Sequence, residues 1–233
     1  MRSLVDINQG GRDAWVAAKA ASLSAGTRVL DAGAGICRYR ELFRHCEYVA
    51  QDFCDLGEKN WKYDKIDITS DICSIPLPDA SVDVILCTEV LEHVPDPAGA
   101  VVEFSRLLKS KGILWLTVPL GSGLHQQPHH YYGGFTPHWF RRFLPLHGFD
   151  IVSIVPNGGF FKSYGQETAR IHTILFGEEA APWRRALLWP LKAVTFPFLR
   201  VAAPLFFNAL DHIDKEKNFT VGYFIEAVRR TKD

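Results

Sequence analysis

The sequence has no excess of charge, no paired cysteine motif and no recognisable export signal. Its 26 basic and 26 acidic residues among 233 give a formal net charge of zero, so the electrostatic footprint of a nucleic-acid-binding protein is absent. The cysteines number five and show no C-x-x-C spacing, which indicates reduced thiols. The opening residues MRSLVD are too polar for a secretory signal. We therefore expect a cytoplasmic protein without a nucleic-acid partner.

The sequence also has no internal repeat and no low-complexity tract. Charged residues interrupt its apolar runs before they reach the roughly 18 residues that a membrane-spanning helix needs, which argues against such a helix. An apolar content of 47% is enough for one full core, so we expect a single domain over residues 1–233. The charge is uneven, acidic before Ala180 and basic after it.

Short apolar runs alternate with helical patterns along most of the chain. The runs predicted as strands are 28–31, 48–51, 81–87, 113–118 and 151–155. Helical patterns cover residues 98–108 and 137–146. This alternation predicts an α/β protein with a Rossmann-like, doubly wound and mostly parallel sheet that carries helices on both faces. A last apolar run at 219–228 follows a long insertion.

The segment 181–210 does not fit the sheet pattern. It is apolar and aromatic, with four basic residues and no acidic one. Pro190, Pro197 and Pro204 recur at a seven-residue interval, and each would break or kink a helix, so we expect a helical insertion made of short pieces. Two interpretations stay open. The segment is either a cap over the substrate cleft, or an amphipathic platform on the inner membrane face with Trp183 and Trp189 at headgroup depth.

The most informative motif is VLDAGAG at residues 29–35, which joins a buried strand to a helix expected over residues 38–44. Without Cβ atoms, Gly33 and Gly35 can adopt positive φ and bring the backbone close to a ligand, and the helix N-terminus offers free N–H groups. A second acid, Asp52, ends the next apolar run and could accept both hydroxyls of a ribose. The motif therefore predicts a nucleotide-type pocket.

Two positions separate this motif from the dinucleotide fingerprint. Arg38 stands where that fingerprint has its third glycine, and an acid, Asp31, precedes the first glycine, which disfavours NAD. The motif resembles instead the first motif of the class I S-adenosylmethionine-dependent methyltransferases, over roughly residues 27–149. The resemblance implies S-adenosyl-L-methionine as the cofactor and a final antiparallel strand that completes a seven-stranded sheet.

The stretch DICSIPLPDASVDVILCTEVLEHVPDP at 71–97 resembles the type-11 methyltransferase pattern. The resemblance implies that Asp71 accepts from the adenine amino group, that Ile72 packs on the ring, and that the methionine moiety lies against the loop after the strand at 81–87. The cofactor-binding residues that we expect are Asp31, Gly33, Gly35, Asp52, Phe53, Asp71, Ile72, Cys87, Thr88 and Glu89.

Glu89, Glu92 and His93 follow at i, i+3 and i+4, so on a helix they would share one face. The run CTEVLEHVPDP resembles ubiquinone-pathway O-methyltransferases, in which these positions are associated with magnesium, but the pattern also occurs in type-11 methyltransferases without a metal. Three roles stay open: metal ligands, a base or substrate contact at His93, and a structural or cofactor-loop role. We take His93 as a catalytic candidate and assign no metal.

The run HYY followed by FTP at 130–137 resembles a block found in methyltransferases of surface-polysaccharide and lipid gene clusters. A histidine at the carboxyl edge of the sheet can remove a hydroxyl proton near neutral pH, because its ordinary pKa is about 6.5. His130 is therefore the second catalytic candidate. A metal held by His125, His129 and His130, or partly buried histidines with only hydrogen-bonding roles, are the alternatives.

These features predict an enzyme that transfers a methyl group to a small-molecule, lipid-linked or glycan-linked acceptor, and oxygen is the expected acceptor atom. Many aromatic residues after Gly158 favour an acceptor that is large and apolar. The alternative is a catalytically inactive methyltransferase-like module that associates with a membrane or a partner through residues 181–210.

Overall fold

The computed structural model describes residues 7–54, 64–176 and 182–231 of the chain, without the side chains of residues 7 and 182–186. The described chain forms two compact units. The sheet unit comprises Trp15–Val155 with Gly222–Asp233, and the hairpin unit comprises Met1–Ala14 with Pro156–Val221. Whether the 233 residues act as one domain, as the composition predicts, stays a prediction.

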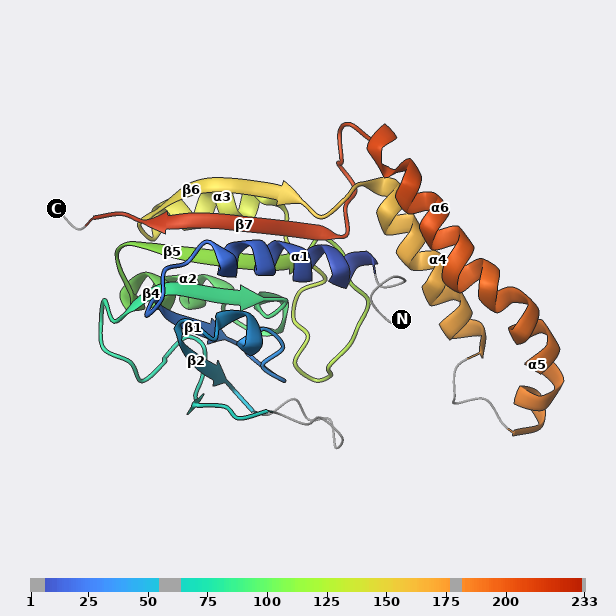
Figure 1. Cartoon of the computed structure of the whole chain (residues 1–233), viewed down its shortest axis with the longest axis horizontal. Coiled ribbons are helices and arrows are strands. Elements are labelled where there is room, and N and C mark those ends of the chain that lie inside the picture. The colour runs from blue at the N-terminus through green and yellow to red at the C-terminus, as the bar shows by residue number, and fades with distance from the viewer. Residues whose placement is uncertain (1–6, 55–63, 177–181, 232–233) are drawn as a thin grey trace. The chain divides into compact units, whose positions relative to one another are not determined.

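The sheet unit contains a seven-stranded sheet in the order β3-β2-β1-β4-β5-β7-β6 (Figure 1). Its strands are β1 (Arg28–Ala32), β2 (Glu47–Asp52), β3 (Ile68–Thr69), β4 (Val82–Thr88), β5 (Leu108–Pro119), β6 (Phe149–Pro156) and β7 (Gly222–Arg229). The pairs from β3 to β5 are parallel, and β7 is antiparallel to β5. The predicted doubly wound sheet and its antiparallel last strand are confirmed.

Helices pack against both faces of this sheet. On one face, Val16 of α1 (Ile7–Ala21) and Phe43 of the 3₁₀ helix η1 (Arg40–Phe43) lie in a core cluster with Trp115 of β5. On the other face, Phe104 of α2 (Pro97–Leu107) and Phe140 of α3 (Pro137–Leu146) lie in a second cluster. The helix expected over 38–44 is thus only a short 3₁₀ helix, because the chain turns directly from the glycine loop towards β2.

Gly112 lies inside β5 and does not end a helix, since α2 already ends at Leu107. A Cβ on Gly112 would lie 2.9 Å from the carbonyl oxygen of Lys109 and 3.1 Å from that of Asp83. Lys111 has a positive φ of 62°, and the β4–β5 register shifts between Val82 and Val84. The glycine therefore gives the backbone room for this irregularity.

The hairpin unit is built from α4 (Phe160–Phe176) and a second, longer helical run (Figure 1). The run consists of α5 (Pro182–Pro197), the π-helix η3 (Phe198–Ala202), α6 (Ala203–Leu210) and the 3₁₀ helix η4 (Asp211–Ile213). From Leu187 to Ile213 it is one uninterrupted helix, so the prediction of short pieces is wrong. A π-helical turn directly after Pro197 accommodates the missing backbone donor, as such turns commonly do.

Close packing and a helix cap both connect α4 to the second helical run. Gly165 of α4 faces α6 so closely that an added Cβ would lie 3.2 Å from Phe207 Cβ and 3.2 Å from the Pro204 carbonyl oxygen. At the start of α4, buried Asp211 accepts the backbone N–H groups of Gly159 at 2.9 Å and Lys162 at 2.8 Å. The carboxylate thereby caps α4 from the far end of the second helix.

The helix Leu187–Ile213 is long and apolar enough to cross a membrane by length and composition, with a mean hydropathy of 1.5 in its most apolar window. Lys192 and Arg200 are the only charged residues between Leu187 and Leu210. Its most apolar stretch of 18 residues holds no more than two charged residues. The expectation that charges exclude a spanning length is therefore wrong, because so few charges leave the stretch apolar on average.

Candidate functional site

The glycine turn lies where β1, β2 and β4 end at the same edge of the sheet, the place where open α/β sheets bind ligands. Gly33 has a φ of 76° and Gly35 a φ of 54°, which confirms the predicted left-handed backbone. The N–H groups of Gly33 and Ala34 both donate to the carbonyl oxygen of Gln51 at 2.9 Å. These two hydrogen bonds therefore hold the turn against the end of β2, and the two glycines have no side chain that would block a ligand.

Asp52 connects the turn to the segment after β2. Its Oδ2 accepts the N–H of Gly35 at 2.8 Å, and its Oδ1 accepts the N–H of Cys54 at 2.9 Å. A carboxylate has about four lone-pair sites, so both oxygens can accept further hydrogen bonds. The next side chain, Phe53, is 54% exposed, and its ring centroid lies 6.1 Å from that of His129. The predicted acid and aromatic ring thus stand beside the glycine turn.

Asp31 points into the protein and not towards the open edge. It is buried, and the Tyr48 hydroxyl donates a hydrogen bond to its Oδ2. The pKa of Asp31 is raised to about 7, mainly by burial and also by the charge of Asp52, while the Tyr48 hydrogen bond and the charge of Arg40 oppose the rise. Arg40 lies over the Tyr48 ring at 4.9 Å. No pattern in the sequence indicates the contact between Asp31 and Tyr48.

The end of β4 brings buried Cys87, then Thr88 and Glu89, to the same edge. Glu89 has a φ of 54° and is bound to Thr117 of β5 twice, through its N–H at 2.9 Å and through its Oε1, which accepts the Thr117 hydroxyl at 2.8 Å. The helix that follows is the 3₁₀ helix η2, Leu91–His93. The expectation that Glu89 shares a helix face with Glu92 and His93 is therefore wrong.

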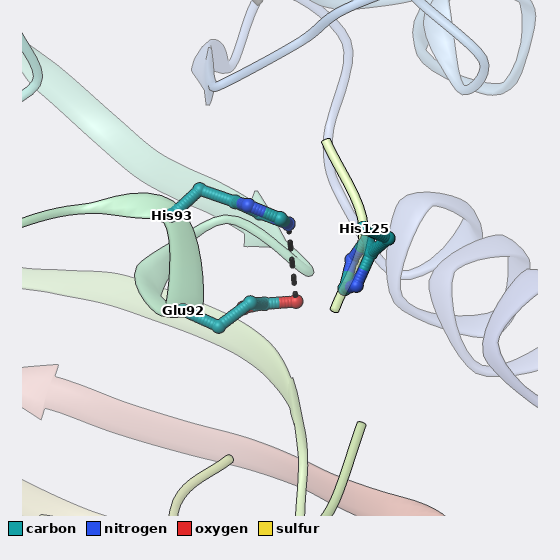
Figure 2. A group of neighbouring side chains, drawn as sticks. All are labelled: Glu92, His93 and His125. Carbon is teal, nitrogen blue, oxygen red and sulfur yellow. Dashed lines mark ion pairs between the residues drawn. The ribbon is translucent and has the colours of Figure 1, made fainter. Parts of the chain in front are cut away.

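Glu92 and His93 meet a distant histidine, as Figure 2 shows. Glu92 is buried, and its Oε1 lies 3.9 Å from His93 Nε2. The ring centroids of His93 and His125 are 4.7 Å apart. His93 Nδ1 lies 2.5 Å from the His129 carbonyl oxygen, and burial lowers the pKa of His93 to about 4. The sequence indicated this grouping only as a cluster of histidines without an established spacing.

His130, the second catalytic candidate, lies beside this group. Its ring centroid is 4.5 Å from that of His125 and 5.4 Å from that of His93. Burial lowers the pKa of His130, and the charge of His125 adds to this effect. Its Nε2 lies 3.1 Å from Ser122 Oγ, while in the described part of the chain its buried Nδ1 has no hydrogen-bond partner. The structure thus brings both catalytic candidates together.

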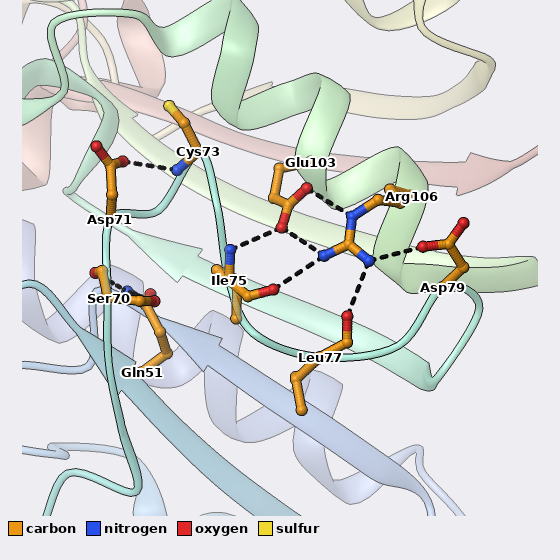
Figure 3. A network of polar contacts seen from close by, with 9 residues as sticks. All are labelled: Gln51, Ser70, Asp71, Cys73, Ile75, Leu77, Asp79, Glu103 and Arg106. Carbon is orange, nitrogen blue, oxygen red and sulfur yellow. Dashed lines mark hydrogen bonds and ion pairs between the residues drawn. The ribbon is translucent and has the colours of Figure 1, made fainter.

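Asp71 and its neighbour Ile72 differ in exposure in the segment after β3, and Figure 3 shows Asp71 in this segment. Asp71 is exposed, and its Oδ1 accepts the N–H of Cys73 at 2.8 Å. Ile72 is buried in the core cluster that contains Phe104. Gln51 of β2 donates to the Ser70 carbonyl oxygen at 2.7 Å. The segment is therefore fixed to the edge of the sheet next to the glycine turn.

Glu103 and Arg106 of α2 hold the following stretch, also visible in Figure 3. Buried Glu103 accepts the N–H of Ile75 at 2.7 Å and pairs with Arg106 at 2.6 Å. Arg106 donates to the carbonyl oxygens of Ile75 and Leu77 and pairs with Asp79 at 2.7 Å. These contacts give Glu103 and Arg106 a structural role.

The family model for a methyltransferase domain matches residues 30–116. The chain is 37% identical over 59 residues to a probable S-adenosylmethionine-dependent methyltransferase of Mycobacterium tuberculosis, which covers 25% of this chain and 22% of that protein. It is 39% identical over 64 residues to a ubiquinone biosynthesis O-methyltransferase of Nitrosomonas europaea, 27% of this chain and 25% of that protein. The matches thus span about a quarter of these relatives.

Solved structures extend the likeness over the whole chain. A chain solved in complex with the Trm112 methyltransferase activator of Haloferax volcanii superposes with a TM-score of 0.57 at 17% identity, covering 96% of this chain and 94% of that one. At this identity the likeness concerns the fold, which is that of the class I methyltransferases. The resemblance read from the glycine turn and from residues 71–97 is confirmed by the match at residues 30–116.

Proposed function

We propose that this chain, which belongs to the class I methyltransferases through its type-11 domain at residues 30–116, transfers a methyl group from S-adenosyl-L-methionine to an oxygen atom of an apolar or lipid-linked acceptor. The observation that carries the proposal is the glycine turn that Gln51 and Asp52 hold open at the carboxyl edge. When bound, the cofactor supplies a methyl group on a positively charged sulfur. The chain's own residues bind and orient the cofactor and the acceptor, and one of them removes the proton of the acceptor.

The residues at the edge fit this cofactor. Left-handed backbone at Gly33 and Gly35 lets main chain approach a ligand closely. Asp52, whose oxygens already accept two N–H groups, has lone pairs left for two ribose hydroxyls. Exposed Phe53 offers an apolar surface beside it. Asp31 does not face the cofactor. It is buried against Tyr48 and supports the glycine turn from the interior of the protein.

His130 is suited to take the proton of an acceptor hydroxyl. The Ser122 hydroxyl donates to the Gly133 carbonyl oxygen at 3.2 Å, so its single proton is used there. His130 Nε2 must then donate to Ser122 Oγ at 3.1 Å, which leaves the lone pair on Nδ1. A fixed tautomer of this kind prepares a histidine as a general base. Most of the rate gain comes from positioning, an effect worth about 7–11 kcal/mol.

The hairpin unit supports an apolar or lipid-linked acceptor. Side chains of the long helix are strongly exposed, among them Leu187 at 71%, Trp189 at 67% and Val194 at 74%. In the described residues only 11% of its most apolar window is buried, and a surface this apolar requires a partner. Its charged residues in this stretch, Lys192 and Arg200, are both basic. We infer that the partner is an anionic lipid bilayer.

The dimensions agree with a bilayer. The helix from Leu187 to Ile213 has 27 residues, about 40 Å at 1.5 Å per residue, against a hydrocarbon core of about 30 Å. Trp189 belongs to the described helix, whereas the side chain of Trp183, the other tryptophan assigned to headgroup depth, lies outside the described residues. The protein thereby works at a membrane surface, where a lipid-linked acceptor is available.

Calorimetric titration with S-adenosylhomocysteine tests the cofactor site. Wild-type protein binds in the micromolar range, and Asp52→Ala abolishes binding while the circular dichroism spectrum is kept. Asp150→Ala serves as the matched control, because that carboxylate pairs only with Arg230 at an exposed position. Absence of binding to the wild type contradicts the proposal and favours a methyltransferase-like module without activity.

Vesicle flotation tests the membrane part separately. The full chain floats with anionic vesicles, and Trp189→Asp combined with Val194→Asp reduces the floated fraction at least about fivefold, since each buried acid costs about 2.5–3.5 kcal/mol. Leu146→Asp, at a residue 57% exposed on α3, is the control and leaves flotation unchanged. Equal flotation of all three proteins rejects the membrane assignment and leaves the cofactor site untouched.

A further inference from the structure

We propose that Glu92, His93 and His125 form a binding site for a divalent transition-metal ion of the zinc class. Each of the three residues offers one ligand atom, and these atoms lie within 4.8 Å of one another. Figure 2 shows the carboxylate and the two rings turned towards the same point. All three belong to the sheet unit. Donors at about 2.0–2.2 Å from one ion lie at most about 4.4 Å apart, so small movements of these side chains bring the three atoms onto a single ion.

The tautomer of His93 prepares it as a ligand. Its Nδ1 lies 2.5 Å from the His129 carbonyl oxygen, and a carbonyl oxygen can only accept. The proton must therefore be on Nδ1, and Nε2 carries a lone pair. That Nε2 faces Glu92 Oε1 at 3.9 Å, a distance at which two acceptor atoms leave room for a cation between them.

His125 repeats this arrangement from another loop. Its Nδ1 lies 2.9 Å from the carbonyl oxygen of Gly123, so Nδ1 again carries the proton and Nε2 the lone pair. Metal-binding histidines almost always donate their second ring N–H to a carbonyl or a carboxylate, which fixes the ring and its tautomer. Both imidazoles here meet that condition through backbone carbonyls.

The backbone holds the two loops together independently of the side chains. The N–H groups of Tyr131 and Tyr132 donate to the carbonyl oxygen of Glu92 at 2.9 and 3.1 Å. This attaches the loop that carries His125 to the 3₁₀ helix that carries Glu92 and His93. The geometry of the three donors is therefore largely set before an ion binds, which lowers the cost of binding.

The donor set selects the class of ion. Two imidazoles and one carboxylate suit zinc and related transition ions, whereas magnesium prefers oxygen ligands. Glu89, the other carboxylate of the motif, accepts the Thr117 hydroxyl at 2.8 Å and is not part of the group of three. Three protein ligands also leave a coordination position open, as in zinc sites that act on a substrate.

The role of the open position rests on the proposed function. An acceptor hydroxyl that binds there loses its proton more readily, because the cation stabilises the alkoxide or phenolate. The proton passes to His130 Nδ1, whose ring lies 4.5 Å from that of His125. The binding of the ion itself does not depend on methyl transfer and can be measured alone.

The test uses the untagged full chain after removal of metal with a chelator. Titration with Co²⁺ is expected to give the visible absorption of a low-coordinate cobalt site at one ion per chain, and Zn²⁺ displaces it. His125→Ala is expected to weaken Zn²⁺ binding at least about 100-fold, beyond the loss expected from a second-shell partner. The control is His138→Ala, an exposed histidine outside the group.

A second variant, Glu92→Gln, keeps the buried shape and removes the charge, and it is expected to lose the cobalt spectrum as well. Absence of stoichiometric binding to the wild type overturns the inference, as does equal binding by His125→Ala and His138→Ala. S-adenosylhomocysteine titration of the same preparations separates the two proposals. Cofactor binding without metal rejects the metal site alone, and metal binding without cofactor rejects the proposed function alone.

Discussion

Val90, in the loop after β4, packs directly on Gly33 in the loop after β1, so that a Cβ on Gly33 would lie 2.4 Å from Val90 Cγ2. The two loops that we assign to the cofactor are thus in contact with each other and form one wall of the site. Their packing requires the glycine for a second reason, since its φ of 76° is strained for any other residue.

Gly33→Ala is expected to abolish binding of S-adenosylhomocysteine, because the new methyl group displaces Val90 and strains the turn. Replacing both residues, as Gly33→Ala with Val90→Ala, removes the overlap but not the strain, and restores binding only in part. Calorimetry on the wild type, Val90→Ala and the two glycine variants measures both effects. Full recovery in the double variant would mean that the left-handed backbone is unimportant.

The stability of the sheet unit is expected to fall as the pH rises from about 4 to about 7. The folded-state pKa of Asp31 is about 7, above an unfolded value of about 3.9. A group whose pKa is raised by folding stabilises the folded state fully at pH values below its unfolded pKa. This stabilisation, on the order of 4 kcal/mol, is lost as the pH rises to the folded pKa. Urea unfolding at several pH values measures it.

Two substitutions assign this pH dependence to Asp31. Asp31→Asn flattens the profile because no carboxyl remains to ionise. Tyr48→Phe moves the decline to higher pH, since the Tyr48 hydrogen bond lowers the pKa of Asp31. An unchanged profile in Asp31→Asn would place the titrating group elsewhere.

Arg106→Ala is expected to destabilise the protein by about 2–3 kcal/mol, because buried Glu103 loses a charged hydrogen-bond partner. Arg230→Ala breaks an exposed pair with Asp150 and is expected to cost about 0–1 kcal/mol. Thermal or urea unfolding compares the two. Similar losses would show that the α2 network contributes no more than a surface pair.

Gly165→Leu is expected to loosen the contact of α4 with α6, where an added Cβ already lies 3.2 Å from Phe207 Cβ. Overpacking of this kind costs about 1–3 kcal/mol. Limited proteolysis of the hairpin unit measures the effect, and Gln166→Leu at the adjacent position is the control. Equal protease resistance would mean that the two helices adapt without cost.

Much of the sheet could be predicted because strand alternation and glycine turns are local properties. Asp52 was placed at the end of the second strand from sequence alone, and the structure binds it to Gly35 at 2.8 Å. The position of Gly112 inside β5 could not be predicted, since the sequence does not reveal the β4–β5 register shift. Glycine is required at this position because nearby carbonyl oxygens leave no room for a Cβ atom, and these contacts depend on the tertiary structure.

The histidine group could not be predicted, because it depends on contacts between loops without periodicity. The loop that carries His125 is joined to Glu92 by the backbone hydrogen bonds of Tyr131 and Tyr132, which no sequence pattern indicates. The long helix was missed for a different reason. Each proline was treated as a break, whereas a π-helical turn after Pro197 lets the helix continue.

The hairpin unit is inserted between β6 and β7, which are neighbours in the sheet. The N–H of Arg230, after β7, donates to the carbonyl oxygen of Gly148, before β6. Because β6 and β7 are antiparallel neighbours, the chain leaves β6 for the insertion and returns to β7 at the same end of this strand pair. Other helices could therefore replace this insertion without any change in the strand order or in the loops after β1 and β4.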